Sequence, residues 1–497
     1  MISMRPMIFI FLLAVVTIPL AAKDYVVQSF GIKGDGVTVN TASIQYAIDY
    51  ISTHGGGRLV FTSGTYQTGS IYLKSDVTLH LEQGATLSST TNPFDFVKDP
   101  DIRWMAMIFA KSQKNIGITG EGTIDGRGFE TANNMVQYIH RGIYNDPLNA
   151  DRPNELNRPE NIHFYKCENV VIKGITLKDP ASWNQTYEQC VNLLVDGITV
   201  DSKSYWNNDG IDIVDCDGVI IRNSHFDAAD DAICFKSNSP DQICQNVVVE
   251  NCVARSSASG LKFGTASWGG FRNFKITKLT VYDTYRSAIT FATVDGGVVE
   301  NIVVDGVRSI NTGNVLYLRI GNRRGNDKKP VMKDIVIRNV YAEVPISKPD
   351  AGYNIEGPVE DLPRNISPAS IVGLPDHRIE NVVLENVEIV YPGGGNPYYA
   401  RVGLTPEDLR KVPEMTENYP EFSQFKELPA WGFYLRHAGH ISFRNVTLRA
   451  ESQDYRPAIV LDDMTESSFI GTKIEEADNP LPKEQIFQFR SENIRIE

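Results

Sequence analysis

The chain has 497 residues, 42% of them hydrophobic, and a formal net charge of −13. This composition excludes an intrinsically disordered chain, and the length allows one large domain or several ordinary ones. The acidic balance argues against a nucleic-acid partner, because phosphate binding requires a basic surface. An acidic substrate stays open, since a local basic pocket can lie within an acidic surface.

The first 22 residues have the pattern of a signal peptide. Arg5 supplies the positive charge, Met7 to Leu20 is apolar but short for a membrane span, and Ala21-Ala22 offers a cleavage site. We therefore expect residues 1–22 to be removed and the protein to be secreted or periplasmic. No membrane span would then remain, and an uncleaved anchor is the alternative.

A helix is expected before the first strands. Asn40 or Thr41 can cap a helix from Ser43 to Ser52, and the glycines at 55–57 end it. The segments GRLVFTSGTY and SIYLKSDVTLHL then alternate apolar and polar residues, as strands do. The helix would cover the open end of the strand stack that follows, where unpaired strand edges invite aggregation.

A short pattern repeats through most of the remaining chain. Examples are NVVIKGITLKD from Asn169, NLLVDGITVDS from Asn192, NVVVENCVARS from Asn246 and NIVVDGVRSIN from Asn301. Apolar residues alternate with period two around a central Gly or Asn, which predicts short strands joined by tight bends. The period of roughly 23 to 30 residues lies in the solenoid range. We predict an all-β fold, a right-handed single-stranded parallel β-helix with a short N-terminal capping helix.

The repeat is interrupted three times, but no linker divides the chain. Residues 127–161, 345–378 and 391–436 break the rhythm, and insertions in a solenoid form loops that often surround the binding face. We expect one domain over residues 23–497 and a monomer. The six cysteines permit disulfides in an exported protein, but Cys167, Cys190 and Cys216 recur at roughly the spacing of the repeat, which favours buried free thiols.

An acidic stretch lies in the middle of the repeats. Asp209 and Asp230 are separated by about one coil, so Asp209 and the adjacent pair Asp230–Asp231 should meet on neighbouring coils. Three carboxyl groups this close raise the pKa of at least one of them, which allows one acid and two bases. A calcium site or a solvated acidic ladder is the alternative. Asp212, Asp215 and Asp217 are expected to be turn residues.

At this point the sequence resembles glycoside hydrolase family 28, the polygalacturonase and rhamnogalacturonase-like pectin hydrolases. The match rests on FGIKGDGVTVNTASIQYAID, GEGTIDGRG, NNDGIDI and DDAICFKS. The resemblance implies an inverting hydrolase of α-linked pectic polysaccharides or oligosaccharides, without a metal or another cofactor. By motif, Asp230 would be the general acid, and Asp209 and Asp231 would hold and activate water. We expect exo action, because the insertions could close one end of a groove.

The sequence departs from the family pattern at two motifs. Ala258-Ser259-Gly260 stands in place of Gly-His-Gly, and Ala288-Ile289-Thr290 in place of Arg-Ile-Lys. The groups that grip a galacturonate carboxylate must therefore differ. The candidates for substrate binding are Lys236, Lys262, Arg286, Asn207 and Trp206. Two other functions stay open: a calcium-dependent pectate-type lyase, and a carbohydrate-binding β-helix without catalysis.

Overall fold

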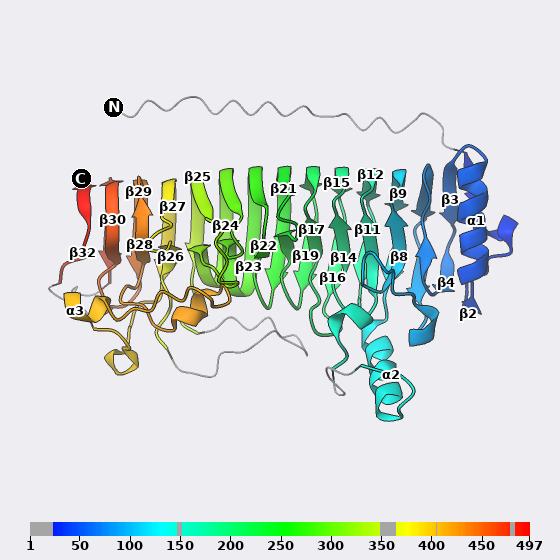
Figure 1. Cartoon of the computed structure of the whole chain (residues 1–497), viewed down its shortest axis with the longest axis horizontal. Coiled ribbons are helices and arrows are strands. Elements are labelled where there is room, and N and C mark those ends of the chain that lie inside the picture. Colours follow the sequence, from blue (N-terminus) through cyan, green and yellow to red (C-terminus); the bar gives the residue numbers. More distant parts are fainter. Residues whose placement is uncertain (1–22, 147–151, 348–363, 404, 478–482) are drawn as a thin grey trace.

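The computed structural model describes residues 23–146, 152–347, 364–403, 405–477 and 483–497, so the expected signal peptide lies outside the described residues. The named strands stack coil upon coil and pair in parallel, which makes a right-handed parallel β-helix (Figure 1). Helix α1 (Thr41–Thr53) lies at the N-terminal end of the stack. Among the described residues, no helix has the length and apolar character needed to cross a membrane.

Strand pairing divides each coil into three faces. The first face contains β5 (Ile71–Tyr72), β8 (Ala106–Lys111), β11 (Glu160–Tyr165), β14 (Gln185–Glu188), β17 (Ile211–Val214), β20 (Ile233–Ser237), β22 (Leu261–Ser267), β26 (Ala369–Val372), β28 (Phe433–Gly439) and β32 (Ile486–Phe489). The second contains β1 (Asp24–Val26), β3 (Gly57–Phe61), β6 (Val77–Leu81), β9 (Lys114–Gly120), β12 (Glu168–Lys173), β15 (Val191–Asp196), β18 (Asp217–Arg222) and β33 (Glu492–Ile496).

The third face and the bends complete each coil. This face contains β2 (Asp35–Val39), β4 (Gly64–Thr68), β7 (Ala85–Ser89), β10 (Thr123–Asp125), β13 (Thr176–Lys178), β16 (Thr199–Ser202), β19 (His225–Ala228) and β31 (Lys473–Glu476). Longer strands pass around a corner and join two or three faces: β21 (Cys244–Ser256), β23 (Gly270–Thr293), β24 (Val298–Ile320), β25 (Val331–Glu343), β27 (Ile379–Tyr391), β29 (Ser442–Ala450) and β30 (Ile459–Ile470).

The predicted period-two alternation is confirmed on the first face. Ile211 and Ile213 of β17 are buried in the core and pair with Ile233 and Phe235 of β20, 22 residues later. The residues between them therefore point to the outer side of this face. This alternation places polar side chains of successive coils above one another outside the core.

The predicted Gly and Asn bends are also present. The central residues of three repeats, Gly174, Gly197 and Asn251, have positive φ angles. The leading residues Asn115, Asn169 and Asn192 have positive φ angles too, a backbone region that asparagine tolerates better than most residues. Their side chains form a ladder, in which Asn169 donates to Asn115 at 2.9 Å and Asn192 donates to Asn169 at 3.1 Å. The leading Asn of each repeat therefore both turns the chain and ties neighbouring coils together.

Helix α1 confirms the predicted cap and extends it. The helix begins two residues before Ser43 and ends one residue after Ser52, and it buries Ile44, Ile48 and Ile51 against the first coils. Asn40 occupies the capping position, but its side chain makes no capping bond. It accepts instead from the backbone N–H of Lys33 and donates to Lys33 and Thr38 carbonyls.

Two of the three insertions carry short helical elements that the sequence did not predict, and residues 348–363 of the third lie outside the described residues. The insertion at 127–161 contains helix α2 (Gly128–His140) and a 3₁₀ turn at Glu155–Asn157. The insertion at 391–436 contains α3 (Pro406–Leu409) and 3₁₀ turns at Pro397–Tyr399 and Phe422–Phe425. Further 3₁₀ turns lie at Val27–Phe30 and Pro93–Asp95. In Figure 1, α2 and α3 project from the same lower side of the stack.

The six cysteines are buried free thiols, as their spacing predicted. Cys190 and Cys216 belong to neighbouring coils, and the backbone N–H of Cys190 points at the Cys216 sulfur at 3.3 Å. These small side chains fill the core at the corner between the first and second faces. They stabilise the stack by packing, without a covalent cross-link.

Candidate active site

The three aspartates singled out in the sequence lie side by side on neighbouring coils. Asp209 lies two residues before β17, and Asp230 and Asp231 form a bend between β19 and β20. The backbone N–H of Gly210 donates to the Asp231 carbonyl at 2.9 Å, and that of Asp230 donates to the Asn208 carbonyl at 3.3 Å. The one-coil spacing therefore brings these carboxyl groups together, whereas their catalytic roles stay a prediction.

Asp231 is held by two donors from the next coil. Lys262 Nζ donates to Asp231 Oδ2 at 2.6 Å, and the backbone N–H of Ser259 donates to Oδ1 at 3.2 Å. Burial raises the pKa of Asp231, but the charges of Lys262 and Lys236 outweigh it and bring the pKa below its ordinary value. Asp231 is therefore the carboxyl group of this set that most readily stays ionised.

Asp230 has the opposite electrostatic environment. Burial and the neighbouring Asp231 carboxylate raise the pKa of Asp230, although Arg286 and Lys262 oppose the shift. Its side chain is only half-buried, whereas Asp209 and Asp231 are each 3% exposed. Asp230 is thus the member of the trio that solvent reaches and that most readily holds a proton.

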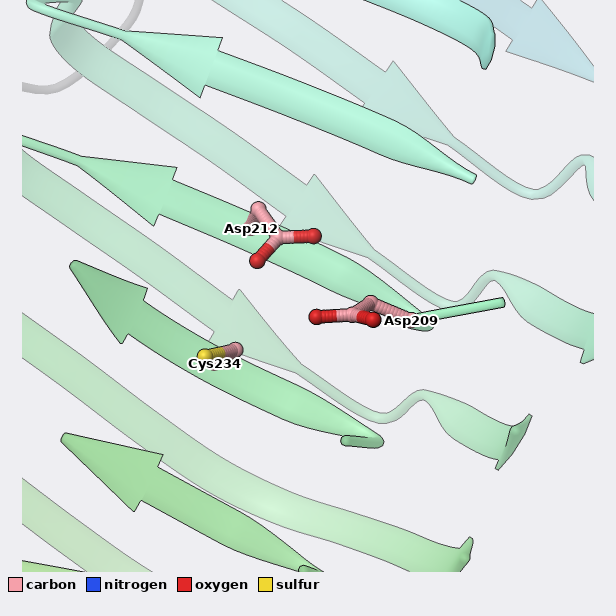
Figure 2. A group of neighbouring side chains, drawn as sticks. All are labelled: Asp209, Asp212 and Cys234. Carbon is pink, nitrogen blue, oxygen red and sulfur yellow. The ribbon is translucent and has the colours of Figure 1, made fainter. Parts of the chain in front are cut away.

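A fourth aspartate belongs to the cluster and corrects the sequence prediction. Asp212 was expected to be a turn residue, but it lies on β17, fully buried on the outer side of the first face (Figure 2). Lys236 Nζ donates to Asp212, to Asp209 Oδ2 at 3.2 Å and to the Cys234 sulfur at 3.0 Å. Burial and Asp212 raise the pKa of Asp209, while Lys236 lowers it.

Of the two other aspartates expected at turns, Asp215 lies in the bend before β18, whereas Asp217 is the first residue of β18. Asp215 accepts the backbone N–H groups of Asn238 and Ser239, at 3.1 and 3.0 Å, and burial raises its pKa to about 6. Asp217 accepts side-chain amides of Gln245 and Asn246 from the next coil. Both tie neighbouring coils together.

Each predicted substrate-binding cation already has a carboxylate partner from its own chain. Lys236 contacts Asp209 and Asp212, and Lys262 contacts Asp231. Arg286 Nη1 lies 2.8 Å from Glu421 Oε1, with the two side chains 7% and 14% exposed. None of these pairings was predicted, and together they satisfy the charges that were expected to face a substrate carboxylate.

Two groups that the sequence did not single out come from the insertion at 391–436. Glu421 pairs with Arg286, and the Tyr419 hydroxyl lies 3.0 Å from Lys262 Nζ. Tyr419 is 157 residues from Lys262 in sequence. No repeat or motif relates such distant positions, so only the general tendency of insertions to surround a binding face pointed to this segment.

Trp206 and Asn207 are held by the insertion at 127–161. Arg152 and Arg158 each donate to Asn207 Oδ1, at 2.6 and 2.8 Å, and Arg158 also donates to the Trp206 carbonyl. The Arg152 guanidinium lies 4.5 Å from the centre of the Trp206 ring. Burial of Arg158 and the nearby Arg152 lower the pKa of Arg158 to about 10. Positive charge therefore lies on this side of the aspartates.

Three side chains of this cluster lie close enough together to act as ligands of one metal ion. Asp209, Asp212 and Cys234 are the one such group among the residues described (Figure 2). The ammonium group of Lys236 contacts all three of these side chains. A cation bound there would have to displace or repel Lys236, so the donor set suits a lysine better than a calcium ion, which prefers six to eight oxygen ligands.

The fold and this acidic cluster define the class of the protein: a pectin lyase-like parallel β-helix with paired carboxyl groups on one outer face. The fold is shared with an exopolygalacturonase from Thermotoga maritima, at 21% identity and a TM-score of 0.63, over 86% of this chain and 92% of that one. The family model of glycosyl hydrolases family 28 matches residues 57–297. The chain belongs to this family.

Curated relatives include two proteins of related chemistry. An exo-poly-alpha-D-galacturonosidase of Dickeya chrysanthemi is 28% identical over 254 residues, which is 42% of this chain and 41% of the relative. A probable polygalacturonase of Vitis vinifera is 26% identical over 340 residues, 63% of this chain and 59% of the relative. The match thus spans about half the length of these relatives.

Proposed function

We propose that the protein is an inverting O-glycosyl hydrolase that cleaves α-glycosidic bonds in pectic glycans of the galacturonide or rhamnogalacturonan type. The placement of Asp209, Asp230 and Asp231 on adjoining coils is the observation that carries this proposal. Family membership and the galacturonide-cleaving relatives support the class of reaction and of substrate.

The opposed pKa shifts of the adjacent aspartates assign their roles. Asp230, half-buried and with a raised pKa, would donate its proton to the glycosidic oxygen as the bond from that oxygen to the anomeric carbon breaks. Asp231, held ionised by Lys262, would accept a proton from the water that attacks the opposite face of the sugar. Water thus supplies the new hydroxyl group, and the leaving sugar takes the proton of Asp230.

Asp209 has a supporting part in this scheme. It lies against Asp231 on the neighbouring coil and shares the ammonium of Lys236 with Asp212. One lysine cannot neutralise two carboxylates, so the Asp209–Asp212 pair readily shares a proton. We assign Asp209 to orienting the water and leave the proton transfer to Asp231.

The deciding experiment is incubation with a panel of pectic oligosaccharides, followed by sizing of the products and NMR of the newly formed anomeric centre. We expect new reducing ends of inverted configuration. An ultraviolet-absorbing unsaturated product would indicate a lyase, and binding without turnover would indicate a silent carbohydrate-binding protein.

The variant Asp230→Asn tests the assignment of the acid. It keeps the shape of the side chain and removes the transferable proton, so turnover should fall by about two to four orders of magnitude. Thermal unfolding should stay close to that of the wild type. Wild-type turnover in this variant would refute the role of Asp230.

Exo action and export complete the proposal. The helices of the insertions at 127–161 and 391–436 lie on the same side of the stack, which suits a substrate path closed at one end (Figure 1). Release of one product size from the first turnovers onward would support exo action, whereas a ladder of intermediate sizes would contradict it.

Recovery of a chain shortened by about 22 residues from periplasm or medium would support export.

A further inference from the structure

The cations around the aspartates are already matched by carboxylates of the same chain. Three cations and five carboxyl groups meet there: Lys236, Lys262, Arg286, Asp209, Asp212, Asp230, Asp231 and Glu421. With Asp230 protonated as the acid and one proton shared by Asp209 and Asp212, three carboxylates remain for the three cations. A negative group brought in by a substrate would therefore find none of these cations without a carboxylate of its own.

Glu421 is the decisive member of this set. Its carboxylate lies 2.8 Å from Arg286. It therefore occupies the place that the carboxylate of a bound sugar would need in order to pair with this arginine. Both side chains are largely buried, so water and salt screen the pair much less than a surface pair. A uronate reaching Arg286 would have to displace Glu421 or lie beside it.

Glu421 is fixed in place by the packing of its insertion. Phe422, its direct neighbour, is 3% exposed and lies in a second hydrophobic cluster with Phe425, Leu428 and Tyr434. Upstream, Arg319 Nη2 donates to the carbonyl oxygens of Glu414 and Met415, at 2.6 and 2.8 Å, and Asn322 donates to Thr416. The segment is thus anchored on both sides of Glu421, and moving the carboxylate away would cost part of this packing.

We propose that the sugar bound next to Asp230 is uncharged, either a neutral glycosyl residue or a uronide with an esterified carboxyl group, and that Glu421 determines this specificity. The proposal rests on the proposed function, because it concerns the substrate of that reaction. It is confined to the sugar beside Asp230. Arg152 and Arg158 bring positive charge to Trp206 and Asn207, and the proposal does not extend to a sugar bound there.

The test compares two substrates that differ only in charge: an oligogalacturonide as the free acid and the same oligomer fully methyl-esterified. The wild type should show the higher kcat/KM on the ester. Glu421→Gln frees the charge of Arg286 and should move the ratio of the two kcat/KM values by about tenfold toward the free acid, the effect of one charged hydrogen bond.

Two further variants separate charge from packing. Glu417→Gln makes the same change in net charge at an exposed position of the same insertion, so it should leave the ratio unchanged. Glu421→Asp keeps the negative charge and should retain the preference for the ester. A loss of the preference in Glu421→Asp as large as in Glu421→Gln would show that packing, and not charge, decides, which would overturn the proposal.

The outcomes also separate this inference from the proposed function. Hydrolysis of both substrates at equal kcat/KM, or a preference for the free acid, would overturn the role of Glu421 and leave the hydrolase assignment standing, provided that Asp230→Asn abolishes turnover. Hydrolysis of neither substrate, nor of any pectic oligosaccharide, would overturn both.

Discussion

The regular coils and the insertion at 391–436 contribute to the site in different ways. The coils supply Asp209, Asp230 and Asp231, and the spacing of these residues follows from the repeat itself. The insertion supplies Tyr419 and Glu421, which no periodicity relates to the residues they contact. The comparison teaches that the repeat sets the reacting groups and their nearest cations, whereas an interruption of the repeat adds the carboxylate that pairs with Arg286.

The sharpest test of the coil contribution is Lys236→Met. The substitution leaves Asp209 and Asp212 buried without their shared cation, which should destabilise the protein by about 3–5 kcal/mol and abolish turnover. Urea unfolding and activity assays measure the two effects. Lys114→Met removes an exposed pair with Glu168 and serves as the control, with an expected effect below about 1 kcal/mol. Equal stability losses would contradict this account of Lys236.

Two glycines compare the coils with an insertion directly. Gly120, in β9, has a φ of +120°, and a Cβ atom there would lie 1.9 Å from the Leu81 carbonyl oxygen of the neighbouring coil. Gly120→Ala should therefore cost about 3 kcal/mol or more. Gly142 follows α2 and has open space around its Cβ position, so Gly142→Ala should cost only about 1–2 kcal/mol for its left-handed backbone. Thermal unfolding of both variants would show whether coil stacking is the stricter constraint.

The smallest expected effect concerns the attachment of the 391–436 insertion in acid. Burial raises the pKa of Glu414, but the hydrogen bond with His437 and the charge of Arg436 outweigh it and bring the pKa below its ordinary value. A carboxyl group whose pKa falls on folding stabilises the folded state above its unfolded pKa and loses this effect as the pH falls through the folded value. Below about pH 4.5 the insertion should therefore loosen before the coils unfold.

Limited proteolysis at falling pH, with an acid-active protease, would detect this loosening as early cleavage within residues 391–436. Glu414→Gln should show the same cleavage pattern at neutral pH, with activity reduced less than tenfold. Simultaneous cleavage of coils and insertion at every pH would contradict a separate attachment.

Much of the fold could be predicted because it is periodic. Ile211 and Ile213 face the core and Asp212 faces outward by simple alternation, and the positive φ angles at Gly174 and Gly197 follow from the central Gly of the repeat. Asp212 could have been recognised too, since alternation places it on the same side as Lys236 one coil later. The expectation of a turn role overlooked this geometry.

The rest depended on contacts between distant parts of the chain. Helix α2 lies in an insertion without the repeat pattern, and the pairing of Arg286 with Glu421 spans the C-terminal half of the protein. The sequence alone would place a charged residue of an insertion at the surface. Only the folded chain shows that Phe422 and the hydrophobic cluster around it bring Glu421 inward. The sequence motifs and the repeat spacing could therefore not predict which charges are paired at the site.

The division of the reacting groups between two adjoining coils restricts how this molecule can grow. Duplicating a whole coil elsewhere in the stack would lengthen the surface without disturbing the chemistry. Duplicating one between Asp209 and Asp231 would move them apart by about 4.8 Å, the spacing of neighbouring strands. Protein engineers who wish to extend the substrate path should therefore add coils on either side of this pair and never within it.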